Sequence, residues 1–164
     1  MKKNCKIIKA TQKDIPSILE FIRALAVYEK LESEVVVTEE LLLKNLFGER
    51  PCAEVIFYEA DSIKVGFALF FNNFSTFLGL PGIYLEDLFV KPEFRGEGYG
   101  KELLIHLASL TIERGCGRLE WSVLDWNKPA LDFYASINAV PMSEWTAQRL
   151  TGNSLRVLAE SKKC

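Results

Sequence analysis

The residues best suited to chemistry in this sequence form a glycine-rich loop between an apolar run and a helical pattern. The apolar run spans residues 83–90, and leucines at positions 103, 104, 107 and 110 then recur at helical spacing, which predicts a helix to about Arg114. The loop between them reads Arg95-Gly96-Glu97-Gly98-Tyr99-Gly100-Lys101. The first N–H groups of a helix lack intrahelical partners, and the helix dipole adds roughly half a positive charge there. Because glycines also let a ligand approach the backbone closely, the loop predicts a site for a phosphate or pyrophosphate.

The glycine spacing excludes two common nucleotide-binding motifs. A Rossmann loop needs G-x-G-x-x-G, but the third glycine here, Gly100, comes one residue early. A Walker loop ends in G-K-[ST], whereas Lys101 is followed by Glu102. For the glycines alone, a solvated turn remains the alternative interpretation.

The loop and a second motif together resemble a known enzyme family. R-G-x-G-x-G follows a strand with Glu86-Asp87, and Asn127-Lys128-Pro129-Ala130 and Phe133-Tyr134 come after another predicted strand. This combination is similar to the GCN5-related N-acetyltransferases and covers residues 7 to about 150. The resemblance implies that acetyl-coenzyme A (acetyl-CoA) is the co-substrate. The residues that it implies for cofactor binding are Leu88, Phe89, Val90, Arg95, Gly96, Glu97, Gly98, Tyr99, Gly100, Lys101, Asn127, Lys128, Pro129 and Ala130.

Acetyl transfer to an amine needs a base for the ammonium proton and an acid for the departing thiolate. Glu86 is the candidate base, because a carboxylate in an apolar strand is costly unless it is hydrogen-bonded or functional, and the resemblance implies that it acts through water. Tyr134 is the candidate acid, since phenols have a pKa of about 10 and thiols of about 8.5. Strand alternation predicts that Asp87 lies on the opposite face, where a structural hydrogen bond is favoured over the alternative, a catalytic role.

Within the family, the sequence is most similar to the diamine acetyltransferases, which include the spermidine/spermine and thialysine enzymes. The similarity rests on residues 25–29, 84–87 and 124–127, and the run Phe74-Ser75-Thr76-Phe77 looks more like the thialysine branch. An extended cation needs distributed carboxylates. The implied contacts of a small-molecule amine are Tyr28, Glu29, Glu86, Glu120, Trp121, Ser122 and Asp125.

Two other functions remain open at this stage. One is an acetyltransferase that acts on protein lysines or N-termini. The other is a non-catalytic module that senses acyl-CoA, although such a module has no need for Glu86 and Tyr134 together. The resemblance also implies a homodimer that pairs through its C-terminal strands, with its sites near the interface.

Composition and charge also limit the number of domains, the partners and the location expected for this protein. The chain has 164 residues and a formal net charge of −2, so one domain over 1–164 is expected. Dispersed basic residues argue against nucleic acid, and the lack of a long apolar run argues against a membrane span or signal peptide, so a cytoplasmic protein is expected. Cys5, Cys52, Cys116 and Cys164 share no metal-ligand spacing and are interpreted as reduced thiols. With a single histidine, His106, no metal site is predicted.

The mixture of helices and strands predicts an α/β (α+β) fold. The resemblance sharpens this to a mostly antiparallel sheet of six or seven strands flanked by helices, in which two parallel central strands splay apart around the cofactor. The predicted strands span 6–10, 53–60, 63–71, 83–90 and 118–124, with a final strand or pair over 140–149, and the connection 72–82 is predicted as a loop. The predicted helices span 15 to about 30, 41–47, about 101–114, 129–136 and 154–160.

Overall fold

The computed structural model describes residues 4–161, and the chain divides into two compact units, Met1–Ser122 and Val123–Cys164. The thiols of Cys5, Cys52 and Cys116 are free, whereas Cys164 lies outside the described residues. Between residues 4 and 161 there is no helix long and apolar enough to cross a membrane.

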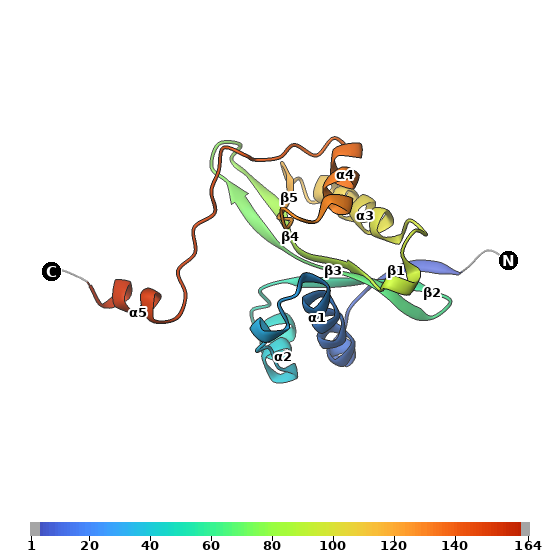
Figure 1. Ribbon diagram of the computed structural model, residues 1–164, viewed down its shortest axis with the longest axis horizontal. Helices are drawn as coiled ribbons and strands as arrows, with labels where there is room; N and C mark the ends of the chain where they lie inside the picture. The colour runs from blue at the N-terminus through green and yellow to red at the C-terminus, as the bar shows by residue number, and fades with distance from the viewer. Residues whose placement is uncertain (1–3, 162–164) are drawn as a thin grey trace. The chain divides into compact units, whose positions relative to one another are not determined.

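The first unit is an α/β layer structure built on one sheet (Figure 1). Its five strands, counted within the described residues, lie in the order β1-β2-β3-β4-β5, antiparallel except for the parallel pair β4 and β5. Helices α1 and α2 cover one face and α3 covers the other. The elements are β1 (Cys5–Lys9), η1 (Gln12–Asp14), α1 (Ile15–Glu29), η2 (Glu32–Glu34), α2 (Glu39–Phe47), β2 (Glu54–Ala60), β3 (Ile63–Ser75), β4 (Leu80–Val90), η3 (Pro92–Phe94), α3 (Tyr99–Glu113) and β5 (Leu119–Trp121).

Local sequence signals determine where α1 and α2 begin and end. The Thr11 backbone N–H donates to Asp14 Oδ2 over 2.8 Å, and this capping box opens the helical segment. Lys30 ends α1 in the left-handed region with φ of 62°. Thr38 Oγ1 accepts a hydrogen bond from the Leu41 N–H at the start of α2. The C-terminal end of α1 lies against β4, where the ring centroid of Tyr28 is 6.3 Å from that of Phe89.

An aromatic cluster fixes α1 on the sheet. Phe21 is 1% exposed, and its ring centroid lies 5.0 Å from that of Phe67, 5.7 Å from Phe57 and 6.5 Å from Phe89. Replacing such a buried ring by alanine costs about 3–5 kcal/mol of folding free energy. The cluster therefore holds Tyr28 and Glu29, at the end of α1, against the middle of the sheet.

The predicted α/β class with a mostly antiparallel sheet is confirmed, but two boundaries were wrong. The predicted loop 72–82 is largely strand, because residues 72–75 pair with 80–83 and only a tight turn around Gly79, with φ of 66°, separates them. The parallel strand predicted over 118–124 is limited to residues 119–121, since it pairs only with Ile83–Leu85.

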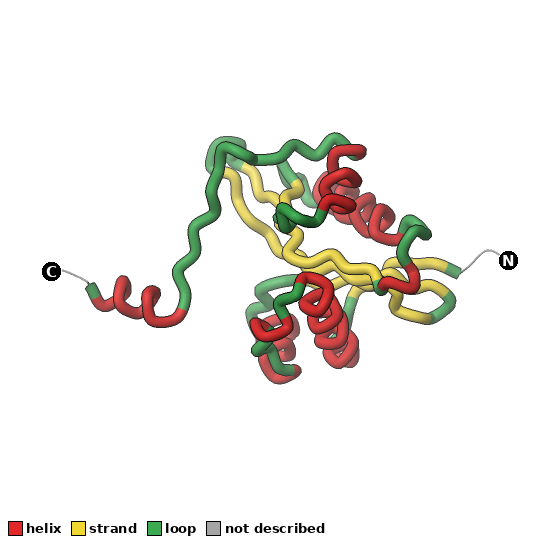
Figure 2. Tube along the Cα trace, viewed as in Figure 1, coloured by secondary structure: helices red, strands yellow, loops and turns green. Residues whose placement is uncertain are grey.

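The second unit contains α4 (Lys128–Ser136) and α5 (Gly152–Glu160). The strand predicted over 140–149 is absent, and Figure 2 draws this segment as loop. An extended segment becomes a strand only when it exchanges backbone hydrogen bonds with another strand, and residues 140–149 pair with none of the strands in the described residues. The sheet therefore has five strands between residues 4 and 161 instead of six or seven.

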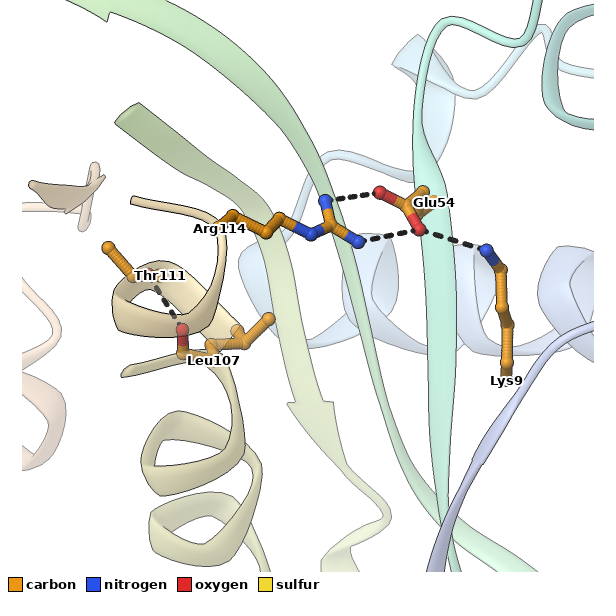
Figure 3. A network of polar contacts seen from close by, with 5 residues as sticks. All are labelled: Lys9, Glu54, Leu107, Thr111 and Arg114. Atoms are coloured by element: carbon orange, nitrogen blue, oxygen red, sulfur yellow. Dashed lines mark hydrogen bonds and ion pairs between the residues drawn. The ribbon is translucent and has the colours of Figure 1, made fainter. Parts of the chain in front are cut away.

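A charged network anchors the C-terminal end of α3 to the sheet (Figure 3). Arg114 donates two hydrogen bonds to Glu54 of β2, over 2.6 and 3.0 Å, and Lys9 Nζ lies 3.0 Å from the same carboxylate. The hydrogen bonds from Arg114 hold the pKa of Glu54 below its ordinary value. Because α3 begins at the glycine-rich loop, this network also fixes the helix that carries the loop.

Candidate active site

The strand that carries Glu86 is interrupted at that residue by a β-bulge. Leu69 pairs with Asp87 and Phe70 pairs with Leu85, so Glu86 has no partner on β3. Its side chain is exposed, whereas Asp87 is half-buried. The regular alternation assumed for Glu86 and Asp87 is therefore broken between them. No sequence signal marks the bulge, because the run around it is uniformly apolar.

Asp87 lies in an unfavourable environment for a carboxylate. Burial, followed by the charges of Glu86 and Glu29, raises the pKa of Asp87 to about 6. Burial also raises the pKa of Glu29, at the end of α1. Across residues 4–161 the Asp87 carboxylate has no hydrogen bond or ion pair, so the predicted structural hydrogen bond was wrong. A half-buried carboxylate with a raised pKa is a candidate for the catalytic role that the sequence analysis did not favour.

One edge of β4 is unpaired just beyond the bulge. Parallel pairing with β5 stops at Leu85, so the backbone from Glu86 to Val90 has no partner strand on that side among residues 4–161. The Lys91 N–H donates to Val65 O of β3 over 2.9 Å. Alternation therefore turns the N–H groups of Leu88 and Val90 toward the unpaired side. These donors can bind an extended chain with carbonyl groups.

The glycine-rich loop joins this open edge to α3. Gly96 and Gly98 have φ of 84° and 86°, a region that favours glycine, and a Cβ added at either would meet nothing within 4 Å. Gly98 is the N-cap of α3, so the helix N-terminus faces open space. Tyr99 is 5% exposed and stacks on Tyr58 with centroids 4.7 Å apart. The loop thus has a buried anchor and an accessible backbone, as an anion site requires.

The two cations of the loop differ in their surroundings. Arg95 Nε donates to the carbonyl oxygen of Val90 over 3.0 Å. Its guanidinium lies 4.5 Å from the centroid of the Tyr28 ring and 5.2 Å from that of Phe89. Lys101, by contrast, is exposed on the first turn of α3.

Strand β5 brings Glu120 and Ser122 to the place where β4 and β5 separate. Glu120 accepts a hydrogen bond from Asn73 Nδ2 over 2.8 Å and forms an ion pair with Arg118. Ser122 Oγ lies 2.7 Å from the Tyr84 hydroxyl. Glu120 therefore already has two polar partners. Trp121, which lies between Glu120 and Ser122 in the sequence, is half-buried.

The remaining predicted site residues belong to the second unit. Asn127 Oδ1 accepts a hydrogen bond from the Ala130 N–H, so Asn127 caps α4, with Pro129 in the first turn. Lys128 pairs with Asp132, and Asp125 is exposed. Tyr134 is half-buried, with its ring centroid 5.6 Å from that of Phe133. The predicted acid and base therefore come from different units. No group of three metal-ligating side chains occurs in the part of the chain that the structure describes.

Comparisons with known proteins agree on one family. A model of the acetyltransferase (GNAT) family matches residues 17–138. The chain is 38% identical to a thialysine N-epsilon-acetyltransferase of Bos taurus, over 93% of this chain and 96% of that protein. It is 32% identical to the L-ornithine N5-acetyltransferase NATA1 of Arabidopsis thaliana, over 93% and 87%. Among solved structures, an integron cassette protein from the mobile metagenome of V. cholerae matches with a TM-score of 0.81 and 28% identity, covering 96% of this chain and 98% of that one.

Proposed function

The chain belongs to the acetyltransferase (GNAT) family and is an acetyltransferase, and on that premise we propose that it transfers an acetyl group from acetyl-CoA to a primary amine of a small molecule. The observation that carries the proposal is the glycine-rich loop at the N-terminus of α3, next to the unpaired edge of β4. The family match runs from the first unit into the second, which supports one acetyltransferase domain over 1–164.

We propose that the acceptor is a side-chain amine of a small amino acid, as in thialysine or ornithine. The support is that relatives named for these two substrates are 38% and 32% identical over most of both chains. The spermidine/spermine N(1)-acetyltransferase-like protein 1 of Homo sapiens is 29% identical, and the aligned part is only 20% of that protein. In the first unit, Glu29, Glu86 and Asp87 offer carboxylates that attract an ammonium group. Polyamines and diamines are the alternative acceptors.

The first unit supplies the binding side of the proposed reaction. Backbone N–H groups at the start of α3 would hold the pyrophosphate of acetyl-CoA, because a helix N-terminus with flanking cations favours an anion. The N–H groups of Leu88 and Val90 would bind the pantetheine arm and polarise the thioester carbonyl. Asn127 to Ala130 of the second unit are proposed as further cofactor contacts.

The proposed transfer is a direct attack of the amine. Glu86, exposed at the bulge, would take a proton from the ammonium group through water, which is needed because alkyl ammonium groups have a pKa of about 10. The new C–N bond would form as the C–S bond breaks, and Tyr134 would give its hydroxyl proton to the thiolate. The nitrogen would then lose its extra proton through water to the Tyr134 phenolate, which gives the neutral amide and restores the hydroxyl. Tyr28, Glu120, Trp121, Ser122 and Asp125 are proposed to position the amine.

We propose that the protein is a homodimer. Its support is the second unit, in which Met142, Trp145, Val157 and Leu158 are 56–72% exposed. Side chains of this size are rarely left exposed together unless a partner covers them. Sedimentation equilibrium at micromolar concentration is expected to give twice the chain mass, and a monomer would contradict this part of the proposal.

A coenzyme A release assay tests the function. The panel contains thialysine, ornithine, lysine, putrescine, spermidine, spermine and a lysine-containing peptide. Turnover is expected on the free amino acids, at rates above those for polyamines. Turnover on the peptide alone would favour a protein acetyltransferase, and cofactor binding without turnover on any amine would favour an acyl-CoA sensor.

A further inference from the structure

The side chain of Arg95 connects the glycine-rich loop to the end of α1. We propose that Arg95 is a positioning residue for the amine side of the site, which acts by holding Tyr28 in place when the loop binds the cofactor. This inference rests on the proposed function, and it assigns to the arginine side chain a role beyond the attraction of phosphate.

The side-chain contacts of Arg95 are with residues of β4 and α1. Its Nε bonds to Val90 O on the unpaired side of β4, and its guanidinium lies over the rings of Tyr28 and Phe89. Phe89 is 4% exposed and belongs to the core cluster that fixes α1, so it provides a rigid base. One side chain thereby touches the loop, the strand and the helix.

The geometry suits arginine and no other cation. A guanidinium is planar, so it can lie flat on an aromatic ring while its Nε–H donates in the plane, whereas an ammonium group provides a point charge without that plane. The centroids of Tyr28 and Phe89 are 6.3 Å apart with an interplanar angle of 59°, so both rings face the same guanidinium. A lysine at 95 would keep the charge and lose this arrangement.

The Arg95 N–H donates to Pro92 O over 3.2 Å, which anchors the start of the loop. Gly96 and Gly98 carry no side chains, and the nearest buried anchor is Tyr99, four residues further on. A ligand that orders the loop backbone would therefore also order the Arg95 side chain, and through it the Tyr28 ring. Tyr28 lies in the last turn of α1, next to Glu29, so the contact with Arg95 adds the loop to the groups that orient the Tyr28 ring beside this carboxylate. Coupling between two sites is reciprocal, so each ligand should tighten the binding of the other.

The test compares Arg95→Lys with the matched loop variant Lys101→Met. In steady-state kinetics with thialysine, Arg95→Lys is expected to raise the KM of the amine about fivefold or more. In direct binding without amine, the same substitution is expected to change the Kd of acetyl-CoA by less than about twofold, because the charge remains. Lys101→Met is expected to weaken acetyl-CoA binding and to leave the KM of the amine nearly unchanged, because it removes a charge near the cofactor without disturbing Tyr28.

Binding measurements and a double mutant isolate the contact. By calorimetry, coenzyme A should tighten amine binding to the wild-type enzyme about fivefold, and this gain should vanish in Arg95→Lys. Tyr28→Leu should raise the amine KM similarly, and the double mutant should be no worse than either single variant, because both remove one contact. An increase confined to the KM of acetyl-CoA in Arg95→Lys, or additive effects in the double mutant, would overturn the inference while leaving the function intact. A wild-type enzyme that acetylates no amine would overturn both.

Discussion

Replacement of Asp87 by asparagine should stabilise the folded protein at neutral pH. Asparagine has nearly the same shape, and it removes the charge that burial, Glu86 and Glu29 make unfavourable. The pKa of Asp87 is about 6 in the folded chain and 3.8 ordinarily. A difference of about 2 units corresponds to roughly 3 kcal/mol, and because the side chain is only half-buried we expect about 1–3 kcal/mol.

The pH dependence of this gain has a definite sign. An acid whose pKa is raised on folding binds its proton more tightly in the folded state, so the wild-type protein loses stability as the pH rises from about 4 to about 6. Above about pH 6 the full penalty is present. Asp87→Asn should therefore match the wild type near pH 4 and exceed it at pH 7.

Urea unfolding at a series of pH values from 4 to 7.5 measures the difference. Asp132→Asn is the matched control, because Asp132 is exposed in an i,i+4 pair with Lys128 and should change stability by less than about 0.5 kcal/mol. A difference between Asp87→Asn and the wild type that does not vary with pH, or a destabilisation at pH 7, would refute the reasoning. Loss of activity in the stabilised variant would show that the enzyme keeps this carboxylate for function.

Three further substitutions test other parts of the structure. Gly82→Ala should lower the melting temperature, because its Cβ would lie 2.3 Å from Asn73 Oδ1 in a packed sheet, at a cost of about 1–3 kcal/mol; an unchanged melting temperature would contradict that contact. Tyr134→Phe should reduce kcat about 10²-fold or more, and a loss below about threefold would rule out the acid role. Arg114→Met should destabilise the protein by about 1–2 kcal/mol at pH 7, because it removes the ion pair with Glu54. This loss of stability should shrink as the pH falls below the ordinary pKa of Glu54, 4.5, since protonation of Glu54 removes the pair in the wild type. Equal losses in urea unfolding at pH 7 and below pH 4.5 would argue against a stabilising pair.

Short-range signals in the sequence predicted most elements of the first unit. Thr11 with Asp14 and Thr38 mark helix starts through bonds that span three residues, so no distant partner decides them. The glycine-rich loop was also predictable, because the positive φ of Gly96 and Gly98 is a local requirement. These features depend on neighbouring residues along the chain.

The features that the sequence analysis predicted wrongly all depend on contacts with segments distant in the sequence. The bulge at Glu86 arises from the register of β3, and the short β5 ends where β4 turns away from it. The segment 140–149 has the composition of a strand and pairs with no strand among the described residues. The environment of Asp87 was missed for the same reason, since Glu29 approaches it from a helix 58 positions earlier in the chain.

The bulge at Glu86 makes this residue an insertion in an otherwise regular strand. Leu85 pairs with Phe70 and Asp87 pairs with Leu69, which are consecutive on β3, so Glu86 is the extra residue. Substitution at position 86 would leave both pairings unchanged. Deletion of Glu86 would restore one-to-one pairing, and Leu85 and Phe89, which are 2% and 4% exposed, would keep their faces of the sheet. A chain without residue 86 should therefore fold with a regular β4 and lose only the side chain that projects at the bulge, so that this position is expected to matter for activity and not for folding.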